Sequence, residues 1–507
     1  MAAQCNPACQ RVRKANAPVL AAFEQQERAF PANQALVRAL RRPTVLSQPQ
    51  LDRGMALLGE AGRLQRKLRS SSPVSVTALG ASNTVRGGCV RDQQPGQSCA
   101  NEKYTNRSDD SSPYGWLLQA WEALNRSVLA PGSVLLNRAK MATPPEGFTV
   151  CLNRYVPSHV DVVLLSFADM CHSEFPPWKY WKNGLNNASV SIDLLLSGGL
   201  GVTGGPVLPA LETIVRELRQ RVDPPTIVLF DLAQFQYLGQ DLSFATACDA
   251  AYHALAAYYQ LSRVSMRDAI WLEAKTGGHR LHWKKWMGAD GTHLDLAVGD
   301  RMAAELLVHW TMRVSSAALP GLLPPQDVPW LTSDRNGLFG PTRKRQSMYT
   351  KHMGRMKMAN GTVAALCVDF DSASSPYLRQ QSLWRFVEWD NGTDPVTGRA
   401  VLKPKPGFTA RSRGAQLRID TTRDGHTQLR LGFLRTYSSG AVAQMRCVAP
   451  CTCAEMNLSV HTEARTSTTH FEHVAGGVSS PSGSSCQLEL SLLTDDEPFK
   501  LISMHAS

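Results

Sequence analysis

Apolar residues in the first two thirds of the chain follow two alternating patterns. Short continuous apolar runs bounded by turn-forming residues predict buried strands, and such runs occupy residues 74–79, 133–137, 159–167 and 226–232. Longer runs with apolar residues three and four positions apart predict amphipathic helices at residues 51–68, 114–124, 207–222 and 245–259. Residues 262–267 lead into one more short strand or helix. Strands that alternate with helices favour a parallel sheet covered by crossover helices on both faces.

The pattern changes after Pro341. Helical spacing ends there, and from Thr362 onward short runs of β-forming residues alternate with turn signals. These runs lie at residues 384–389, 416–419, 428–434, 441–447 and 487–493. They predict a β-sandwich-like second domain. We therefore expect four parts: a peripheral segment at 1–50, an α/β domain at 51–315, a linker at 316–361 and a β-rich domain at 362–507.

The composition is that of a globular protein. A chain of 507 residues with 43% hydrophobic and 19% charged residues has enough apolar side chains for a sizeable core. Its formal net charge of +12 is spread along the sequence. A nucleic-acid module gathers its basic residues on one face beside stacking aromatics, so we expect no nucleic-acid partner. No stretch of the sequence approaches a membrane span in length and hydropathy.

Twelve cysteines and six Asn-x-Ser/Thr sites favour the secretory pathway, with disulfides and glycosylation. The six sites lie at Asn106, Asn125, Asn187, Asn360, Asn391 and Asn457. Cys447, Cys451 and Cys453 also have the close spacing of a metal knuckle. No matching second half and no paired histidines accompany them, so we predict disulfides and expect neither a metal nor a cofactor.

The N-terminal residues 1–30 contain no apolar segment of the kind found in signal peptides. Two interpretations stay open at this point. Either the protein is cytoplasmic, or the recorded chain lacks its true start, with a signal or anchor. We expect the second, because the cysteines and glycosylation sites favour an oxidising compartment.

Two separated segments carry the residue types of a nucleophilic site. Asp290-Gly-Thr-His293 precedes an amphipathic run, and an acid three residues before a histidine can fix its tautomer and raise its basicity. Far upstream, the predicted strand 74–79 breaks at Gly80 and places Ser82 on the following turn. Sites in parallel sheets lie at the carboxyl ends of strands, so we expect Ser82 as nucleophile, His293 as general base and Asp290 as the orienting acid. The alternatives are an ordinary turn serine, a helix N-terminal acid and a surface histidine.

These segments resemble the blocks of the SGNH hydrolase, or GDSL-esterase, superfamily, in the type found in green algal and plant proteins. Gly80-Ala81-Ser82 is similar to the nucleophile block, and Asp290-Gly-Thr-His293 is similar to the last block. Residues 137–143 and 166–171 are similar to the second and third blocks, and the C-terminal region is similar to a β domain that follows such hydrolase domains. The resemblance implies a flavodoxin-like three-layer α/β sandwich with a parallel sheet, and serine-esterase chemistry without a cofactor.

The resemblance also implies three donors of an oxyanion hole, and this chain departs from two of them. The backbone N–H of Ser82 is kept, but Met141 and Ala142 replace the paired glycines of the second block. Met170 stands where the side chain of a third-block asparagine is expected. A thioether donates no hydrogen bond, and losing one donor typically costs on the order of a hundred- to a thousandfold in rate. Asn83, directly after the serine, is a candidate replacement donor, and Asp169 is a candidate acid of the third block. The full set of oxyanion candidates is Ser82, Asn83, Met141, Ala142, Asp169 and Met170.

We therefore expect a serine esterase that hydrolyses O-acyl groups, above all acetyl groups, of polysaccharide with a weakened oxyanion hole. The substrate class follows from the resemblance and the accessory β domain, not from residue chemistry. Three alternatives stay open: a degenerate domain that binds glycans without turnover, an acyltransferase, and a structural extracellular protein. A donor in place of Met170 favours hydrolysis, an apolar pocket favours binding, and a wide separation of Ser82 from His293 favours a structural role.

Overall fold

The computed structural model describes residues 44–55, 59, 61–85, 115–149, 151–168, 170, 207–233, 247–274, 276, 279–287, 293–295, 298–316, 366–370, 375–393, 400–421, 425–436, 439–462, 467–474, 476–481 and 485–506. These residues divide into two compact units. An α/β unit lies within residues 1–140, 156–354 and 393–399, and a β unit lies within residues 141–155, 355–392 and 400–507. The second block of the sequence is thus divided between the two units after Lys140.

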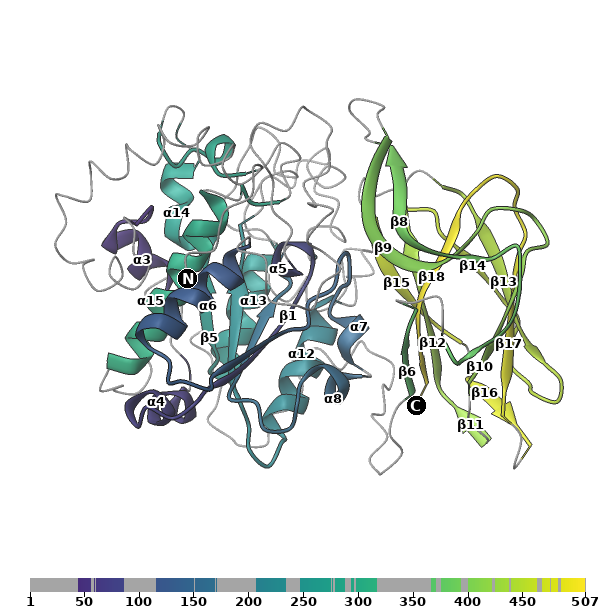
Figure 1. The fold of residues 1–507 in the computed structure, drawn as a ribbon, viewed down its shortest axis with the longest axis horizontal. Helices are drawn as coiled ribbons and strands as arrows, with labels where there is room; N and C mark the ends of the chain where they lie inside the picture. The colour runs from purple at the N-terminus through teal and green to yellow at the C-terminus, as the bar shows by residue number, and fades with distance from the viewer. Residues whose placement is uncertain are drawn as a thin grey trace, which may run out of the picture. The chain divides into compact units, whose positions relative to one another are not determined.

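A five-stranded parallel sheet with the order β2-β1-β3-β4-β5 forms the centre of the α/β unit (Figure 1). Its strands are β1 (Ser75–Gly80), β2 (Val134–Asn137), β3 (Val162–Ser166), β4 (Thr226–Asp231) and β5 (Ser262–Ser265). β3 and β4 are buried at every position, which explains why they are continuous apolar runs rather than alternating ones. The parallel order brings the carboxyl ends of β1 and β3 together, where Gly80 pairs with Ser166.

Helices cover both faces of this sheet (Figure 1). They are α3 (Gln48–Gly54), α4 (Gly62–Arg69), α5 (Ser82–Val85), α6 (Trp116–Ser127), α12 (Val207–Arg219), α13 (Ala247–Tyr259), α14 (Met266–Ala274) and α15 (Gly299–Ser316). α6 and α15 pack on one another and on one face of the sheet, against Val162 and Leu164. Val163 and Leu165, which alternate with them along β3, are just as fully buried on the other face. The predicted flavodoxin-like sandwich is confirmed.

The predicted helix 51–68 is wrong, because two shorter helices, α3 and α4, stand in its place. The break between them contains Gly59. A Cβ added at this glycine would lie 2.2 Å from the backbone carbon of Leu261. The two backbones approach one another too closely for any side chain, and this long-range contact overrides the helical spacing of the apolar residues.

The prediction that residues 1–50 are peripheral is wrong for four of the last seven, Thr44, Val45, Leu46 and Gln50, which are buried. Val45 and Leu46 are buried, at 0% and 1% exposure. Their backbone N–H groups donate to the carboxylate of Glu305 on α15, over 2.8–2.9 Å. Thr44, Val45, Leu46 and Gln50 are therefore buried within the α/β unit, and residues 1–43 lie outside the described residues. Nearly all of the predicted linker, from residue 317 to 361, lies outside them as well.

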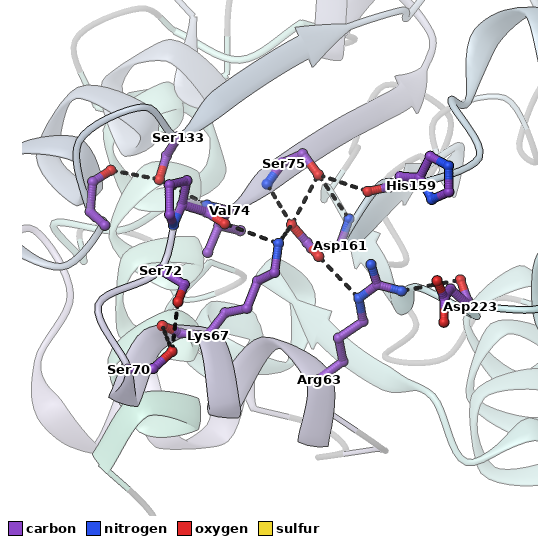
Figure 2. A network of polar contacts seen from close by, with 12 residues as sticks. Arg63, Lys67, Ser70, Ser72, Val74, Ser75, Ser133, His159, Asp161 and Asp223 are labelled. Atoms are coloured by element: carbon purple, nitrogen blue, oxygen red, sulfur yellow. Dashed lines mark hydrogen bonds and ion pairs between the residues drawn. The ribbon is translucent and has the colours of Figure 1, made fainter.

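A saturated charge cluster closes the amino-terminal edge of the sheet (Figure 2). Asp161, directly before β3, is fully buried, and it accepts hydrogen bonds from Arg63 Nε at 3.0 Å and Lys67 Nζ at 2.7 Å. The backbone N–H and hydroxyl of Ser75 donate to the same carboxylate, at 2.8 and 3.0 Å. Burial raises the pKa of Asp161, but these hydrogen bonds outweigh burial and hold that pKa below its usual range. The cluster ties α4 to β1 and β3.

The β unit consists of antiparallel sheets around one apolar core, as the sequence predicts. One sheet has the order β14-β13-β17-β10-β7, a second has the order β15-β12-β18-β9-β8 with β6 also paired to β18, and β11 pairs with β16. The strands are β6 (Leu366–Asp369), β7 (Leu378–Ser382), β8 (Arg385–Thr393), β9 (Ala400–Ala410), β10 (Gln416–Asp420), β11 (Gly425–Thr427), β12 (Leu429–Arg435), β13 (Val442–Val448), β14 (Met456–Ser459), β15 (Thr468–His473), β16 (Val478–Ser480), β17 (Gln487–Leu492) and β18 (Phe499–Ala506).

Among the described residues of this unit, two disulfides have both partners placed, Cys447–Cys453 and Cys451–Cys486. They confirm the prediction that the three closely spaced cysteines form disulfides rather than a metal knuckle. Both cross-links join neighbouring parts of the sandwich, and disulfides persist in oxidising compartments.

Two short helices earlier in the sequence, α7 (Glu146–Thr149) and α8 (Leu152–Tyr155), belong to the β unit. Arg430 on β12 donates to the hydroxyl of Thr149 at 3.2 Å, and the hydroxyl of Tyr155 donates to Asp369 at 3.0 Å. Glu146 is 3% exposed, and neither of its carboxylate oxygens accepts a hydrogen bond from another described residue. Burial raises the pKa of Glu146 to about 7, against the opposing charge of Arg430.

Candidate active site

The predicted nucleophile stands on a tight turn at the carboxyl end of β1. Ser82 is the first residue of α5, whose first turn closes through hydrogen bonds from the N–H groups of Thr84 and Val85 to the carbonyl of Ala81, both at 3.0 Å. A Cβ added at Gly80 would lie 2.6 Å from the carbonyl oxygen of Ser166 and from the hydroxyl of Thr84. Glycine is therefore required where the strand turns into the helix, and this requirement places the serine at the edge of the sheet.

Asn137, at the end of β2, holds this turn in place. Its side-chain N–H₂ donates to the carbonyls of Thr84 and Val85, at 2.9 and 3.3 Å. Its side-chain oxygen accepts the N–H of Ala139 at 3.1 Å. The carbonyls at the end of a short helix lack partners of their own, so this amide satisfies them. The sequence places Asn137 in the second block but does not indicate this role. An amide at the end of the strand beside the nucleophile strand was the available signal.

The structure brings Ser82 and His293 into contact. Their Oγ and Nε2 atoms lie 2.8 Å apart, although the two residues are 211 positions apart in the sequence. Both residues are partly exposed. This is the geometry in which an imidazole takes the proton of an attacking hydroxyl. Asp290, the predicted orienting acid, lies outside the described residues, as does Asp169.

The residues after His293 are fixed to their surroundings through the backbone. The N–H of Leu294 donates to the side-chain oxygen of Asn83 at 3.2 Å, and the N–H of Asp295 donates to the carbonyl of Trp286 at 2.8 Å. The Asp295 carboxylate then accepts the N–H of Val298 at 2.9 Å, just before α15 begins. Asn83 was predicted as a replacement oxyanion donor. In the structure its side-chain oxygen accepts the hydrogen bond from the histidine segment, and its donor role stays a prediction.

A buried acid follows in the first turn of α15. Asp300 is 0% exposed, and burial together with the neighbouring charge of Asp295 raises the pKa of Asp300 well above its usual value. Two carboxyls so close in an apolar setting do not both ionise readily. The raised pKa of Asp300 therefore reduces the negative charge that Asp295 and Asp300 carry together near the start of α15.

The remaining oxyanion candidates lie as follows. Ala142 has φ of 52°, the left-handed conformation that glycine adopts without strain, although no glycine stands here. Its carbonyl accepts the N–H of Thr469, within the β unit, at 2.8 Å. The hydroxyl of Thr143 donates to the carbonyl of Met141 at 3.0 Å. Met170, four residues beyond β3, is 7% exposed and presents a thioether where a donor is expected.

In the described part of the chain, no group of three or more His, Cys, Asp or Glu side chains gathers in a way that could hold a metal ion. No helix in that part is long and apolar enough to cross a bilayer.

Comparison with solved structures gives similar folds at low sequence identity. The chain is similar to a two-domain esterase active on acetylated mannans, with 14% identity and a TM-score of 0.48 over 91% of this chain and 99% of that one. It is also similar to a GDSL-like lipase from Parabacteroides merdae, with 14% identity and a TM-score of 0.31 over 47% and 95% of the two chains. A carbohydrate-binding module from Cellvibrio mixtus lichenase 5A, crystallised with cellotriose, matches 28% of this chain at 14% identity and a TM-score of 0.18.

No family model matches the sequence, and no curated protein matches it. None of the three structural alignments above reaches a TM-score of 0.5, so the pairing of Ser82 with His293 rests on the geometry of the site itself.

Proposed function

We propose that this chain, an SGNH-type α/β unit with a C-terminal β sandwich, is a serine esterase that hydrolyses O-acyl groups, in particular acetyl groups, of polysaccharide. The observation that carries the proposal is the 2.8 Å contact between Ser82 Oγ and His293 Nε2 at the carboxyl edge of the sheet. A hydroxyl and an imidazole in mutual reach, both partly exposed, form the reacting pair of a nucleophilic hydrolase.

The reaction proceeds in two stages. Ser82 Oγ attacks the ester carbonyl while His293 Nε2 takes the serine proton, and the proton then passes to the departing sugar hydroxyl. This leaves an acyl group on Ser82. Water, deprotonated by His293, attacks that acyl group. The bond from the acyl carbon to Ser82 Oγ then breaks, Ser82 Oγ takes the proton back from His293, and the free acid is released. Asp290 is assigned, by the resemblance of its block, to fix the tautomer of the imidazole and stabilise its charged form.

The oxyanion that forms in each stage needs hydrogen-bond donors. The backbone N–H of Ser82, at the start of α5, is the donor that the α/β unit offers beside the nucleophile. Met170 supplies none, so we expect a turnover below that of an enzyme with a complete oxyanion hole.

The buried thioether of Met170 also favours a second candidate, a domain that binds acylated glycans without turning them over. The two candidates differ in one outcome. A Met170→Asn variant of an enzyme limited by the missing donor gains turnover, whereas the same variant of a pure binding domain stays inactive.

The test is hydrolysis of p-nitrophenyl acetate and of a panel of acetylated polysaccharides, including acetylated mannan. The wild-type protein is expected to release acetate, and Ser82→Ala is expected to release none above the uncatalysed rate. Ser133→Ala serves as a matched control, because the Ser133 hydroxyl bonds to Ala130 and Val74 at the opposite end of the sheet. Equal activity of wild type and Ser82→Ala would remove the nucleophile assignment. Transfer of the acetyl group to a second sugar, without free acetate, would make the protein an acyltransferase.

We also propose that the protein acts in the secretory pathway or outside the cell. The two disulfides of the β unit support this, and Asn125 and Asn457, two of the predicted glycosylation sites, are exposed. The check is the intact mass of protein from a eukaryotic secretory host before and after enzymatic deglycosylation. An unchanged mass, together with free thiols at all four cysteines, would favour the cytoplasmic alternative.

A further inference from the structure

Two consecutive residues of the nucleophile turn contact two consecutive residues of the histidine segment. Ser82 Oγ lies 2.8 Å from His293 Nε2, and the side-chain oxygen of Asn83 accepts the N–H of Leu294 at 3.2 Å. The first contact is the reacting pair, but the second takes no part in the reaction. Asn83 and Leu294 are buried, at 1% and 0% exposure, so neither of them is available to a substrate.

Asn83 is anchored on its other side as well. Its backbone carbonyl accepts the indole N–H of Trp116 at 3.0 Å. Trp116 is fully buried and stacks on Phe230 of β4, with ring centroids 4.3 Å apart. The asparagine therefore connects the core of the sheet, through a rigid aromatic pair, to the segment that carries the base.

We propose that Asn83 is a positioning residue for the esterase reaction: its hydrogen bond to Leu294 sets the position of the His293 imidazole relative to Ser82 Oγ. The inference rests on the proposed function and adds a residue that acts through the base rather than on the substrate. The Leu294 N–H is buried, so without Asn83 it loses this partner and the native position of the segment becomes less favourable. The segment then relaxes, and a displacement of about 1 Å at a reacting pair lowers the rate on the order of a hundredfold.

The alternative is a purely structural role, in which Asn83 stabilises the whole α/β unit and has no specific effect on the base. The positioning role and the structural role predict different rates for the conservative variant Asn83→Asp. Asn83→Asp keeps a side-chain oxygen for the Leu294 N–H, and Asn83→Leu has a similar volume without an acceptor. A positioning role predicts that Asp restores the rate and Leu does not, whereas a structural role predicts losses of rate that follow the losses of stability.

The experiment measures kcat and KM for p-nitrophenyl acetate, the melting temperature, and amide exchange of the peptide that contains Leu294, for wild type and both variants. Asn83→Leu is expected to lose about a hundredfold in kcat with KM within about threefold of wild type, and Asn83→Asp is expected to recover at least about tenfold of this loss. Amide exchange is expected to rise at residues 293–295 in the Leu variant and to stay unchanged at β3. In the Asp variant the added carboxylate raises the pKa of the His293 imidazole, so the acidic limb of the kcat profile moves to higher pH.

Several results would overturn the inference. They are full kcat in the Leu variant, a rise in exchange spread evenly over the α/β unit, or an Asp variant as slow as the Leu variant with an unmoved pH profile. If Asn83→Leu fails to fold, Asn83→Ser replaces it, because its shorter side chain cannot span the distance to Leu294. Failure of the proposed function is a separate result, in which the wild type itself neither hydrolyses esters nor depends on Ser82. Exchange at residues 293–295 then still decides whether Asn83 fixes the histidine segment.

Discussion

The two edges of the parallel sheet carry polar clusters of opposite kinds. At the amino edge, Asp161 is fully buried and receives four hydrogen bonds, from Arg63, Lys67 and Ser75 (Figure 2). At the carboxyl edge, Ser82 and His293 are partly exposed and contact one another, and the neighbouring residues Asn83 and Leu294 are joined by a buried hydrogen bond. The first cluster has used its hydrogen-bonding capacity within the fold, whereas the second retains reactive atoms that solvent can reach. Both clusters are polar, so what distinguishes the structural cluster from the candidate active site is that its hydrogen-bonding groups are already paired within the fold.

The largest expected effect lies at the carboxyl edge and concerns activity. His293→Gln removes the base while keeping a polar side chain of similar size, and we expect kcat for p-nitrophenyl acetate to fall by at least about a thousandfold. The melting temperature is expected to stay within about 3 °C of wild type, because little burial is lost. A variant that unfolds, or one that keeps its activity, contradicts the proposed division between the two edges.

The next effect lies at the amino edge and concerns stability. Asp161→Ala leaves Arg63 and Lys67 without their buried partner, and we expect the free energy of unfolding to fall by about 3–5 kcal/mol in urea titrations. The kcat of the folded fraction is expected to stay unchanged. Asp223→Asn is the matched control, because Arg63 bonds only to the backbone carbonyl of this exposed residue, and its effect is expected within about 0.5 kcal/mol.

The same cluster gives a pH dependence with a defined sign. The pKa of Asp161 is lowered in the folded state, so its stabilisation is present above the unfolded value, about 3.9, and is lost as pH falls through the lower folded value. The difference in unfolding free energy between wild type and Asp161→Asn is therefore expected to shrink below about pH 4. A difference that is constant from pH 7 to pH 3 would show that the carboxylate is not held by these charges.

Glu146 in the β unit sharpens the contrast, since it is a buried acid without the partners that Asp161 has. Burial raises its pKa from 4.5 to about 7, so wild-type stability falls as pH rises through this range, by up to about 3 kcal/mol. Glu146→Gln removes this dependence, and its stability relative to wild type is expected to increase between pH 5 and pH 8. The exposed residue of the same unit, Glu455, gives the control variant Glu455→Gln, expected within about 0.5 kcal/mol of wild type. A difference in stability between Glu146→Gln and wild type that stays constant from pH 5 to pH 8 would contradict the raised pKa of this buried carboxyl.

The smallest effect concerns the backbone of the second block. Ala142 has a positive φ, which costs an L-residue about 1–2 kcal/mol relative to its usual conformations. Ala142→Gly relieves this strain and is expected to stabilise the protein by about 0.5–1 kcal/mol, measured by thermal unfolding. Ala139→Gly, at a position outside the left-handed region, is expected to destabilise it by a similar amount. Destabilisation by both variants would contradict the strained conformation of Ala142.

Much of the fold could be predicted because burial on both faces makes parallel strands continuous apolar runs. β1, β3 and β4 lie within a few residues of their predicted positions. The pairing of Ser82 with His293 could be expected for a related reason, since parallel strands present their carboxyl ends at one edge. The break in the predicted helix 51–68 could not, because it depends on the approach of Gly59 to a backbone about two hundred residues away.

The same limit applies within the site. The sequence shows an amide at the end of the strand beside the nucleophile strand, but neither Asn83 nor Asn137 has a pattern that identifies its hydrogen-bond partner. Their partners, Leu294 and Thr84, become neighbours only when the sheet has assembled. The conformation of Ala142 could not be predicted either. An alanine in place of glycine predicts a negative φ, but the observed φ is positive.

The central claim, that Ser82 is a nucleophile activated by His293, is tested most directly by covalent labelling with a fluorophosphonate ester, followed by peptide mass spectrometry. This measurement requires neither the natural substrate nor a complete turnover. We expect one adduct on the peptide containing Ser82 in the wild-type protein, with labelling slowed at least about a hundredfold in His293→Gln and absent in Ser82→Ala. An unlabelled Ser82 in the folded wild-type protein, or labelling at the same rate without His293, would contradict the account.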